Sequence, residues 1–351
     1  MATVKKKPTK KKNRFNRILL LIIMALLLWA LVIIFAPTED AHHYVSSTDA
    51  VPIPDLELPF YEEGAIIISH PGYTLQYEED HEQASWVAYH LTQADLYGDA
   101  NRKDNFRADP TVPTGSATLD DYRNSGYDRG HLIPAADMVR SDETMSASFY
   151  MSNMSPQEPQ FNRGIWATLE AVVRNFANTD RSIYVVTGPV LTDGPYKSIG
   201  KNEVSVPNFY YKVILDYEEP TLKAIGFVLP NEGSKQDVTE FAMSVREVEE
   251  ITGLDFFHRL PDPLEEELET TLNLDLWDFT PFQATAKAKA AFLESGGQPS
   301  AVVVPSEEPE LYTLVVDTLH HILFVIKRES INLLEDAVGK QTLRQVAPFL
   351  Y

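Results

Sequence analysis

The strongest restriction on the fold comes from an uninterrupted apolar run near the N-terminus. Nineteen consecutive residues, 18–36, carry no polar side chain, and an α-helix needs roughly 20 apolar residues to cross a bilayer. Eight Lys and Arg residues and no acidic residue precede the run. Because basic flanks remain in the cytoplasm, we predict a basic cytoplasmic segment at 1–17, one transmembrane helix at 18–36 and a translocated remainder.

Two other kinds of N-terminal segment are disfavoured. A cleaved signal peptide usually has an apolar region of only ~7–15 residues followed by an Ala-x-Ala pattern, and that pattern is missing here. A mitochondrial presequence is an Arg- and Ser-rich amphipathic helix, whereas this start is rich in Lys. We therefore predict an uncleaved anchor in a bacterial cell membrane, with the working part of the chain in the periplasm or at the cell surface.

Composition excludes several kinds of site. The chain has 351 residues and no Cys, which removes disulfide scaffolds, Cys-ligated zinc and thiol catalysis. Its formal net charge is −21. Since eight of the 30 basic residues lie before residue 18, the rest of the chain carries 22 basic and 51 acidic residues. Any polyanion must therefore be bound by a local basic surface.

The pattern along the chain predicts one main domain. Residues 37–60 are rich in Pro and lack periodicity, so we predict an extracytoplasmic tether. From 61 to 282, β-rich runs alternate with helical patterns, which predicts an α+β (mixed α/β) domain. The expected strands are 64–69, 183–190, 209–216 and 222–229, and the expected helices are 163–177 and 237–252, the second ended by Gly253. We interpret 283–351 as a linker and a small C-terminal appendage of unknown role.

Side chains suited to phosphodiester chemistry gather between residues 127 and 174. Hydrolysis of a phosphodiester needs a base for water, positive charge on the phosphate oxygens and help for the leaving oxygen. The ordinary pKa of a histidine, about 6.5, makes His131 available as a base near neutral pH. Asn162 offers a hard carbonyl oxygen that suits Mg²⁺. Arg129 and Arg174 offer bidentate cations for phosphate.

Each of these residues also has an ordinary structural explanation. Asn162 fits the N-cap of a helix that begins just after it, and Glu170 and Arg174 fit an i,i+4 ion pair. His131 fits a turn beside Gly130. The complete set in this order nevertheless favours a site, because a helix that starts at Asn162 also directs its dipole and free amides at phosphate.

The same residues resemble a known family. The sequence Asp-Arg-Gly-His at 128–131 is followed by 152–157, by 162–164 and by Glu170 and Arg174, and further similarity covers 86–92, 186–190, 224–230 and 254–257. This ordered set resembles the DNA/RNA non-specific endonucleases of the ββα-metal class. The resemblance implies a central, mostly antiparallel sheet and an endonuclease that uses Mg²⁺, with Mn²⁺ as a substitute, to cut DNA and RNA independently of sequence. It also leaves a homodimer open.

The resemblance further implies roles for individual residues. His131 corresponds to the general base, and Asn162 corresponds to the only protein ligand of the Mg²⁺, whose waters Glu170 orients. The other positions lie near the phosphate or support the base: Arg129 and Arg174 on the phosphate or leaving-group side, Asn153 beside the base, Asp128 as a structural carboxylate, and Arg102 and Arg163 as phosphate-binding cations. Arg107 is the alternative to Arg102 for the upstream arginine, and the sequence favours Arg102.

The distribution of charge and the candidate residues are also compatible with two other functions. Basic residues cluster between 102 and 174 and acidic residues between 255 and 278, so a basic cleft on an acidic body is compatible with nucleic-acid binding. One rival is a non-catalytic surface receptor for nucleic-acid uptake, and the other is a metallophosphodiesterase for small substrates. We interpret an acidic run as the solvated face of a helix. Its members are Asp262, Glu265, Glu266, Glu267 and Glu269.

Overall fold

The computed structural model of the chain describes residues 53–218 and 220–299. The predicted basic segment at 1–17, the predicted membrane span at 18–36 and the tail from 300 to 351 lie outside these ranges. Within the described ranges, no helix is both long and apolar enough to span a bilayer. The fold concerns the compact unit that begins at Leu56.

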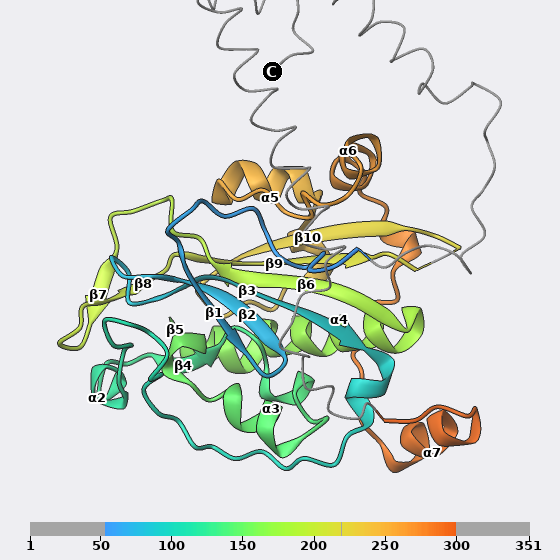
Figure 1. The fold of residues 1–351 in the computed structure, drawn as a ribbon, viewed down its shortest axis with the longest axis horizontal. Helices are drawn as coiled ribbons and strands as arrows, with labels where there is room; N and C mark the ends of the chain where they lie inside the picture. Colours follow the sequence, from blue (N-terminus) through green and yellow to red (C-terminus); the bar gives the residue numbers. More distant parts are fainter. Residues whose placement is uncertain (1–52, 219, 300–351) are drawn as a thin grey trace, which may run out of the picture. The chain divides into compact units, whose positions relative to one another are not determined.

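An antiparallel sheet forms the centre of this unit (Figure 1). In the described part of the chain it has seven strands in the order β1-β2-β3-β6-β9-β10-β11, and every neighbouring pair is antiparallel. The strands are β1 (Ile66–His70), β2 (Tyr73–Glu78), β3 (Gln83–Thr92), β6 (Ser182–Pro189), β9 (Phe209–Asp216), β10 (Lys223–Pro230) and β11 (Ala242–Met243). The predicted α+β class with a central antiparallel sheet is confirmed.

Both faces of the sheet are covered, which explains the apolar strands at its centre. In β9, every residue after Phe209 is buried, as expected of a strand packed on both sides. Tyr210 stacks on Phe161 on one face, with ring centroids 5.3 Å apart, and Tyr211 contacts Phe256 on the other at 5.7 Å. The helices that cover the two faces are α4 (Ala167–Asp180) on the first, and α5 (Val245–Thr252) and α6 (Asp262–Thr270) on the second (Figure 1).

A separate two-stranded ribbon leads into the longest described helix. β4 (Asp128–His131) pairs antiparallel with β5 (Met154–Gln157), so that Gly130 lies opposite Ser155. A Cβ atom on Gly130 would lie 2.1 Å from side-chain atoms of Gln157, so the close pairing requires glycine. The chain then passes through a π-helical turn, η4 (Phe161–Trp166), into α4. The two strands and the helix together form a ββα unit.

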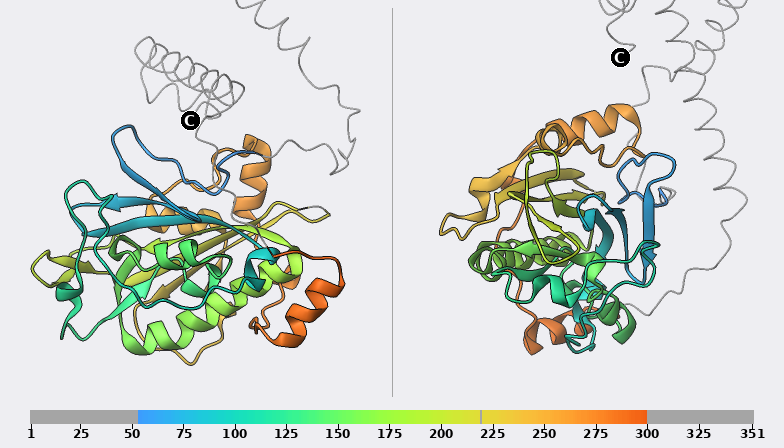
Figure 2. Two further views of the ribbon diagram at one scale, coloured as in Figure 1. Left: turned by 60° about the horizontal axis from the view of Figure 1, so that its bottom comes forward. Right: turned by 90° about the vertical axis from the view of Figure 1, so that its left-hand side faces the viewer.

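Shorter elements fill the connections, and Figure 2 shows them from two further sides. They are η1 (Gln93–Tyr97), α2 (Leu119–Tyr122), η2 (Ala135–Asp137), α3 (Asp142–Ala147), η3 (Met151–Asn153), β7 (Lys197–Ile199), β8 (Val204–Val206), η5 (Val238–Phe241), η6 (Leu274–Leu276) and α7 (Ala286–Glu294).

The expected elements agree with the structure except in one helix. The four predicted strands match β1, β6, β9 and β10 to within two residues at each end, and the predicted helix at 163–177 is found as η4 and α4. The predicted helix at 237–252 is wrong in its first half, which forms η5 and β11. Ser244 and Glu247 cap α5 reciprocally, so that the helix begins only at Val245. It ends, as predicted, at Gly253, whose φ of 72° is left-handed.

The packed domain extends beyond the predicted boundaries of 61 and 282. Leu56 and Leu58 are buried, and the Phe60 amide donates to the Asp255 carbonyl. The predicted tether therefore does not continue beyond Leu56. At the other end, Phe292 of α7 stacks on Tyr97 with centroids 4.5 Å apart. The first part of the predicted linker is thus also packed on the domain.

The acidic run on α6 is only partly solvated. Glu269 is 1% exposed, and Arg246 of α5 binds Glu249, Glu266 and Glu269 at 2.8–2.9 Å. The prediction of a solvated face is therefore wrong for Glu269, which packs where α6 meets α5.

Candidate active site

His131 ends β4, and its imidazole is almost fully buried. Its ring lies edge-on to Phe106 and Phe149, with centroids 5.6 and 4.9 Å apart. Its Nε2 atom is buried and has no hydrogen-bond partner in the described part of the chain. Burial lowers the pKa of His131 to about 3, and the positive charges of Arg102 and Arg129 also lower it. The imidazole is therefore neutral near physiological pH, as a general base must be.

Asn153 holds the backbone that follows His131. Its Oδ1 accepts from the Ile133 amide at 3.0 Å, and its Nδ2 donates to the carbonyls of Ile133 and Ser148 at 3.1 and 2.8 Å. The side chain is fully buried. Its polar atoms are thus bonded to backbone groups, and it holds in place the chain segment that follows His131.

Asp128 and Arg163 fix the orientation of Asn162. The Asn162 Nδ2 donates to Asp128 Oδ2 at 2.9 Å, and Arg163 donates Nε and Nη2 to the two oxygens of the same carboxylate at 2.8 and 2.6 Å. Because an anion engages the amide nitrogen, Oδ1 is the atom of Asn162 left for a cation. A single hard amide oxygen fits Mg²⁺, which keeps several of its own waters when one or two protein ligands bind it.

The helix start differs from both explanations that the sequence offered. Glu158, rather than Asn162, caps it, because the Glu158 carboxylate accepts from the amides of Gln160 and Phe161 at 2.7 and 2.9 Å. The Asn162 amide donates to the Glu158 carbonyl at 2.9 Å and is not free for phosphate. Gly164, at φ −111° and ψ −111°, kinks the turn before α4. The N-cap explanation of Asn162 is therefore wrong.

Arg174 is held by an acid that lies outside its own helix. Its Nη1 donates to Asp137 Oδ1 at 2.9 Å, and the other oxygen of Asp137 accepts from the Tyr89 hydroxyl at 2.8 Å. Asp137 is 1% exposed. The expected i,i+4 ion pair with Glu170 is replaced by this buried pair with Asp137.

Glu170 lies half-buried on α4, one turn before Arg174. Burial raises the pKa of its carboxyl above the ordinary value, whereas the positive charges of Arg174 and Lys212 lower it. A carboxylate in such surroundings binds water or a cation more strongly than one in bulk solvent.

The arginines near the base are not equivalent. The Arg129 guanidinium lies 4.3 Å from the Phe106 ring centroid and forms no ion pair in the described ranges. Arg102 lies 5.0 Å from the centroid of Phe149, the ring that also packs on His131, and its Nε donates to the exposed Asp104 carboxylate at 2.7 Å. Arg107 instead stacks on Tyr150 at 3.8 Å, and its Nη1 donates to the carbonyls of Asn105 and Ser146. The structure therefore places Arg102, and not Arg107, beside the base.

Two charged residues of the site were not assigned a role from the sequence. Asp137 follows His131 by six residues within a largely apolar stretch, and Lys212 interrupts the apolar strand 209–216. A charge in an otherwise apolar run is the signal that identifies both. The role of each residue follows only from the side chains that lie near it in the folded protein.

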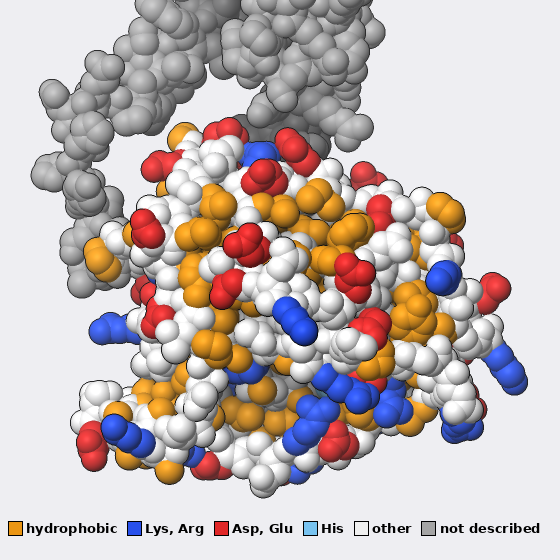
Figure 3. Space-filling view, turned by 180° about the vertical axis from the view of Figure 1, so that it is seen from behind, with side chains coloured by type: hydrophobic (Ala, Val, Ile, Leu, Met, Phe, Trp, Pro, Cys, Tyr) orange, Lys and Arg blue, Asp and Glu red, His pale blue; other side chains and the backbone are white. Residues whose placement is uncertain are grey.

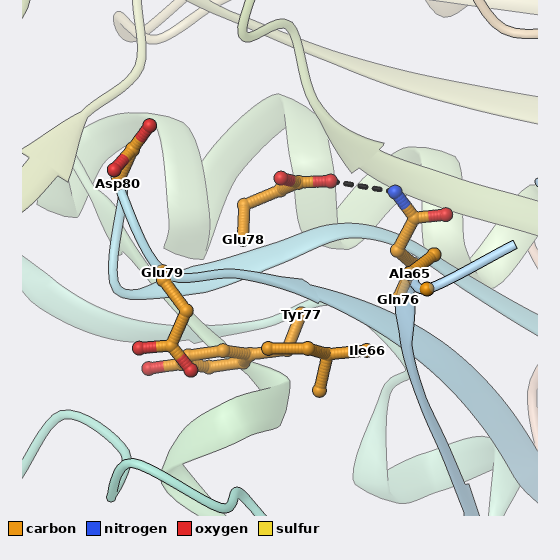
Figure 4. A pocket seen from close by; sticks show the side chains of 8 residues that line it. Ala65, Ile66, Gln76, Tyr77, Glu78, Glu79 and Asp80 are labelled. Carbon is orange, nitrogen blue, oxygen red and sulfur yellow. Dashed lines mark hydrogen bonds between the residues drawn. The ribbon is translucent and has the colours of Figure 1, made fainter. Parts of the chain in front are cut away.

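Two hollows and an acidic cluster help to delimit the site. A hollow of about 280 Å³ opens beside β4 and is lined by Leu119, Tyr122, Arg123, Tyr127, Asp128 and Arg129. A second hollow, of about 220 Å³, lies on the β1–β2 hairpin, where the Gln76 side chain donates a hydrogen bond to the Glu78 carboxylate (Figure 4). None of the residues proposed for the active site lines this second hollow. The cluster of Glu249, Asp255 and Glu269 lies on the α5–α6 side of the sheet, and Arg246 pairs with two of its acids. It is therefore separate from the ββα unit.

Charge also separates on the surface of the domain. On the face shown in Figure 3, Lys and Arg side chains gather in the lower part, and Asp and Glu side chains predominate in the upper part. Figure 1 places the ββα unit in the lower part and α5 and α6 in the upper part. This distribution agrees with a basic surface on an acidic body.

The comparison with known proteins decides the family. A family model described as DNA/RNA non-specific endonuclease matches residues 58–263, more than half of the chain. The chain belongs to the DNA/RNA non-specific endonuclease family. It is therefore a nuclease, an enzyme that hydrolyses phosphodiester bonds, and the resemblance noted in its sequence is confirmed.

Members of this family from distant organisms are similar to the chain. It is 38% identical over 237 residues to the mitochondrial nuclease EXOG of Danio rerio, an alignment that covers 63% of this chain and 69% of that protein. It is also 38% identical to nuclease C1 of Cunninghamella echinulata var. echinulata, over 55% of this chain and 83% of that protein. A solved structure of an EndoG/EndoGI complex matches with a TM-score of 0.55 and 33% identity, and covers 61% of this chain and 95% of that one.

Proposed function

We propose that this member of the family is a membrane-anchored, Mg²⁺-dependent endonuclease that cuts DNA and RNA outside the cytoplasm. The observation that carries the proposal is the neutral imidazole of His131, held between Phe106 and Phe149, on the same ββα unit as an asparagine whose Oδ1 is left for a cation. The first supplies a base for water, and the second supplies a site for a metal.

In this mechanism the neutral imidazole of His131 takes a proton from water as the water attacks phosphorus in line, with inversion of configuration. Asn162 would hold Mg²⁺ through Oδ1, and Mn²⁺ is the expected substitute. A metal at this position would supply positive charge to the phosphate and to the leaving oxygen. Glu170 orders water beside this site through its half-buried carboxylate.

The cations have different roles in this proposal. Arg129 and Arg102 bind the phosphate, and Arg174, which Asp137 holds in place, faces the phosphate or the leaving group. Arg163 was expected to bind phosphate, but Asp128 engages its Nε and Nη2. We therefore assign Arg163, with Asp128, to orienting Asn162, and Asn153 to supporting the backbone of the base.

Recognition through phosphate accounts for activity on both polymers. Contacts to phosphate oxygens carry no sequence information and are shared by DNA and RNA. Cleavage of plasmid DNA and of structured RNA, compared with cleavage of bis(p-nitrophenyl) phosphate, tests this point. We expect both polymers to be cut with a much higher kcat/KM than the small ester. The small-substrate alternative gains if the order is reversed, and the receptor alternative gains if the protein binds the polymers and cuts none of the three.

The location of the enzyme follows from the predicted anchor at 18–36, which lies outside the described residues. We expect the full-length protein to sediment with membranes and a variant that lacks 1–36 to remain soluble. Protease added outside the inner membrane is expected to digest the nuclease domain and to spare the basic segment. A soluble full-length protein, or a protected domain, would remove this part of the proposal. The homodimer stays a prediction, which analytical ultracentrifugation of the soluble variant tests.

A further inference from the structure

Lys212 is a buried lysine whose ammonium has no hydrogen-bond partner among the described residues. It lies in the middle of β9 with no exposed surface, on the sheet face that α4 covers. Its Nζ lies 4.9 Å from the ring centroid of Trp166 and makes no hydrogen bond in the described part of the chain. Since burial of an unpaired ammonium is costly, a compensating charge must lie near.

Lys223 on the neighbouring strand shows how the fold treats an ordinary buried lysine. It is 9% exposed and lies over Trp277 at 4.4 Å. Its Nζ donates to the Leu276 carbonyl at 2.8 Å and pairs with Asp180 at 3.0 Å. Lys223 is therefore locally satisfied at the C-terminal end of α4, whereas Lys212 lies at the N-terminal end without such partners.

The spacing on α4 identifies the charge that compensates Lys212. Trp166, Glu170 and Arg174 are four residues apart, so they follow one another along one face of the helix. Because Lys212 lies against Trp166, Glu170 is one turn further along the same face. The charges that act on Glu170 are Arg174, Lys212, Asp137 and Arg102, and those that act on Lys212 are Glu170, Asp137 and Arg174. Asp137 is already paired with Arg174, so Glu170 is the acid left for Lys212.

We propose that Lys212 is a positioning residue that keeps the Glu170 carboxylate ionised and directed at the catalytic centre from inside the sheet. The proposal rests on the role of Glu170 in the proposed function. It explains why a lysine occupies a buried position of β9: its ammonium is too deep to reach substrate, but its charge acts on the acid that orders water. Burial lowers the pKa of Lys212, and the negative charge of Glu170 opposes that change.

A double-mutant cycle on the metal-free protein tests the coupling without reference to activity. Urea unfolding of the full-length protein in EDTA is measured for wild type, Lys212→Met, Glu170→Gln and the double variant. We expect Lys212→Met to lower the unfolding midpoint strongly in the wild-type background and much less beside Glu170→Gln. If Lys212→Met alone fails to fold, recovery of folding in the double variant supports the same coupling. Equal effects in the two backgrounds would overturn it.

Lys223→Met is the matched control, because it removes another buried lysine that lies on a tryptophan beneath α4. Its effect on the midpoint is expected to be the same with Glu170 or Gln at position 170. A dependence on position 170 as large as that of Lys212 would mean that the cycle reports general loosening of the sheet, which would also contradict the proposal.

Kinetics then separate positioning from substrate binding. Outer-sphere partners of a metal site cost about 10–100-fold in activity when they are removed, so Lys212→Met is expected to lower kcat by at least about tenfold. KM for plasmid DNA is expected to change little, because Lys212 has no exposed surface. Lys223→Met is expected to keep kcat near the wild-type value. A normal kcat in Lys212→Met refutes the positioning role even if the stability coupling is found. If the wild type does not cut nucleic acid, the proposed function fails while the unfolding cycle still reports on the Lys212–Glu170 pair.

Discussion

The side-chain Nδ2 of Asn162 donates to the carboxylate of Asp128 at 2.9 Å, although the two residues lie 34 positions apart in sequence. This contact joins the first residue of the Asp-Arg-Gly-His sequence to the asparagine of the following helical turn. It explains why the two positions belong to one site: the strand supplies an anion that leaves a single oxygen of the asparagine for a cation.

Removal of that anion is expected to weaken metal use without unfolding the domain. In Asp128→Ala, Asn162 and Arg163 both lose their partner, so the amide is free to rotate. Because outer partners of a metal ligand are worth about 10–100-fold in affinity or activity, the Mg²⁺ concentration for half-maximal cleavage should rise by that order. Asp142→Ala, which removes an exposed partner of Lys103, is the control and should leave the Mg²⁺ dependence unchanged. An unaltered Mg²⁺ dependence in Asp128→Ala would show that Asn162 does not need this contact.

Asn153 and Asn162 should give opposite results when each is changed to Ala. Asn153→Ala leaves three buried backbone groups of Ile133 and Ser148 unsatisfied, at roughly 1–3 kcal/mol for each buried group. Urea unfolding should therefore show a loss of several kcal/mol. Asn162→Ala removes a partly exposed side chain with one hydrogen bond, so its stability should change little while its cleavage activity is lost. A stable Asn153→Ala variant would mean that this side chain does not brace the backbone of the base.

Arg102 and Arg107 can be distinguished by salt dependence. Each lost phosphate contact on duplex DNA reduces the slope of log affinity against log salt by about 1, and Arg102→Ala should show this change. Arg107 is engaged by two carbonyls and the Tyr150 ring. Arg107→Ala should therefore keep the wild-type slope and lower the free energy of unfolding by about 1–3 kcal/mol. The reverse pattern would exchange the roles of the two arginines.

Glu269, the buried acid of α6, should make the free energy of unfolding depend on pH. Burial and the neighbouring charges of Glu249 and Glu265 raise the pKa of Glu269 from 4.5 to about 8. Between these two values the folded protein binds more protons than the unfolded chain, so stability should fall as pH rises from 4.5 to 8. One such group changes the free energy of unfolding by at most about 1.4 kcal/mol per pH unit.

Glu269→Gln should reduce this pH dependence, and Glu267→Gln, an exposed change on the same helix, should not. The measurement is the urea midpoint of each variant at several pH values in this range. Equal slopes in wild type and Glu269→Gln would place the titration elsewhere.

The sequence predicted the elements well because periodicity and burial are local properties. The β9 run 209–216 was predicted with its observed bounds, since both its faces are covered and nearly all of its residues are apolar. The start of α5 was missed because Ser244 and Glu247 form a capping box inside an apparently continuous helical pattern. The two competing signals could not be ranked without the neighbouring strand β10, to which β11 pairs.

Partners in space were the part that the sequence could not provide. It identified Arg163, Arg174 and Glu170 as site residues. It did not show that Asp128 forms an ion pair with Arg163 and Asp137 with Arg174. The residues of these two ion pairs lie 35 and 37 positions apart, and no local sequence rule predicts which acidic residue contacts which arginine. The sequence predicts a solvated Glu269 for the same reason: it does not show that Arg246, which lies on another helix, pairs with this carboxylate.

Cleavage of plasmid DNA and RNA by the full-length protein tests the central claim most directly. The reactions contain Mg²⁺ or EDTA, and the wild type is compared with His131→Ala and Asn162→Ala, with circular dichroism to confirm folding. A positioned general base contributes about 10²–10⁴-fold, so His131→Ala should lose that much activity on both polymers, and EDTA or Asn162→Ala should abolish cleavage. Cleavage at the wild-type rate by folded His131→Ala, or undiminished cleavage in EDTA, would contradict the account.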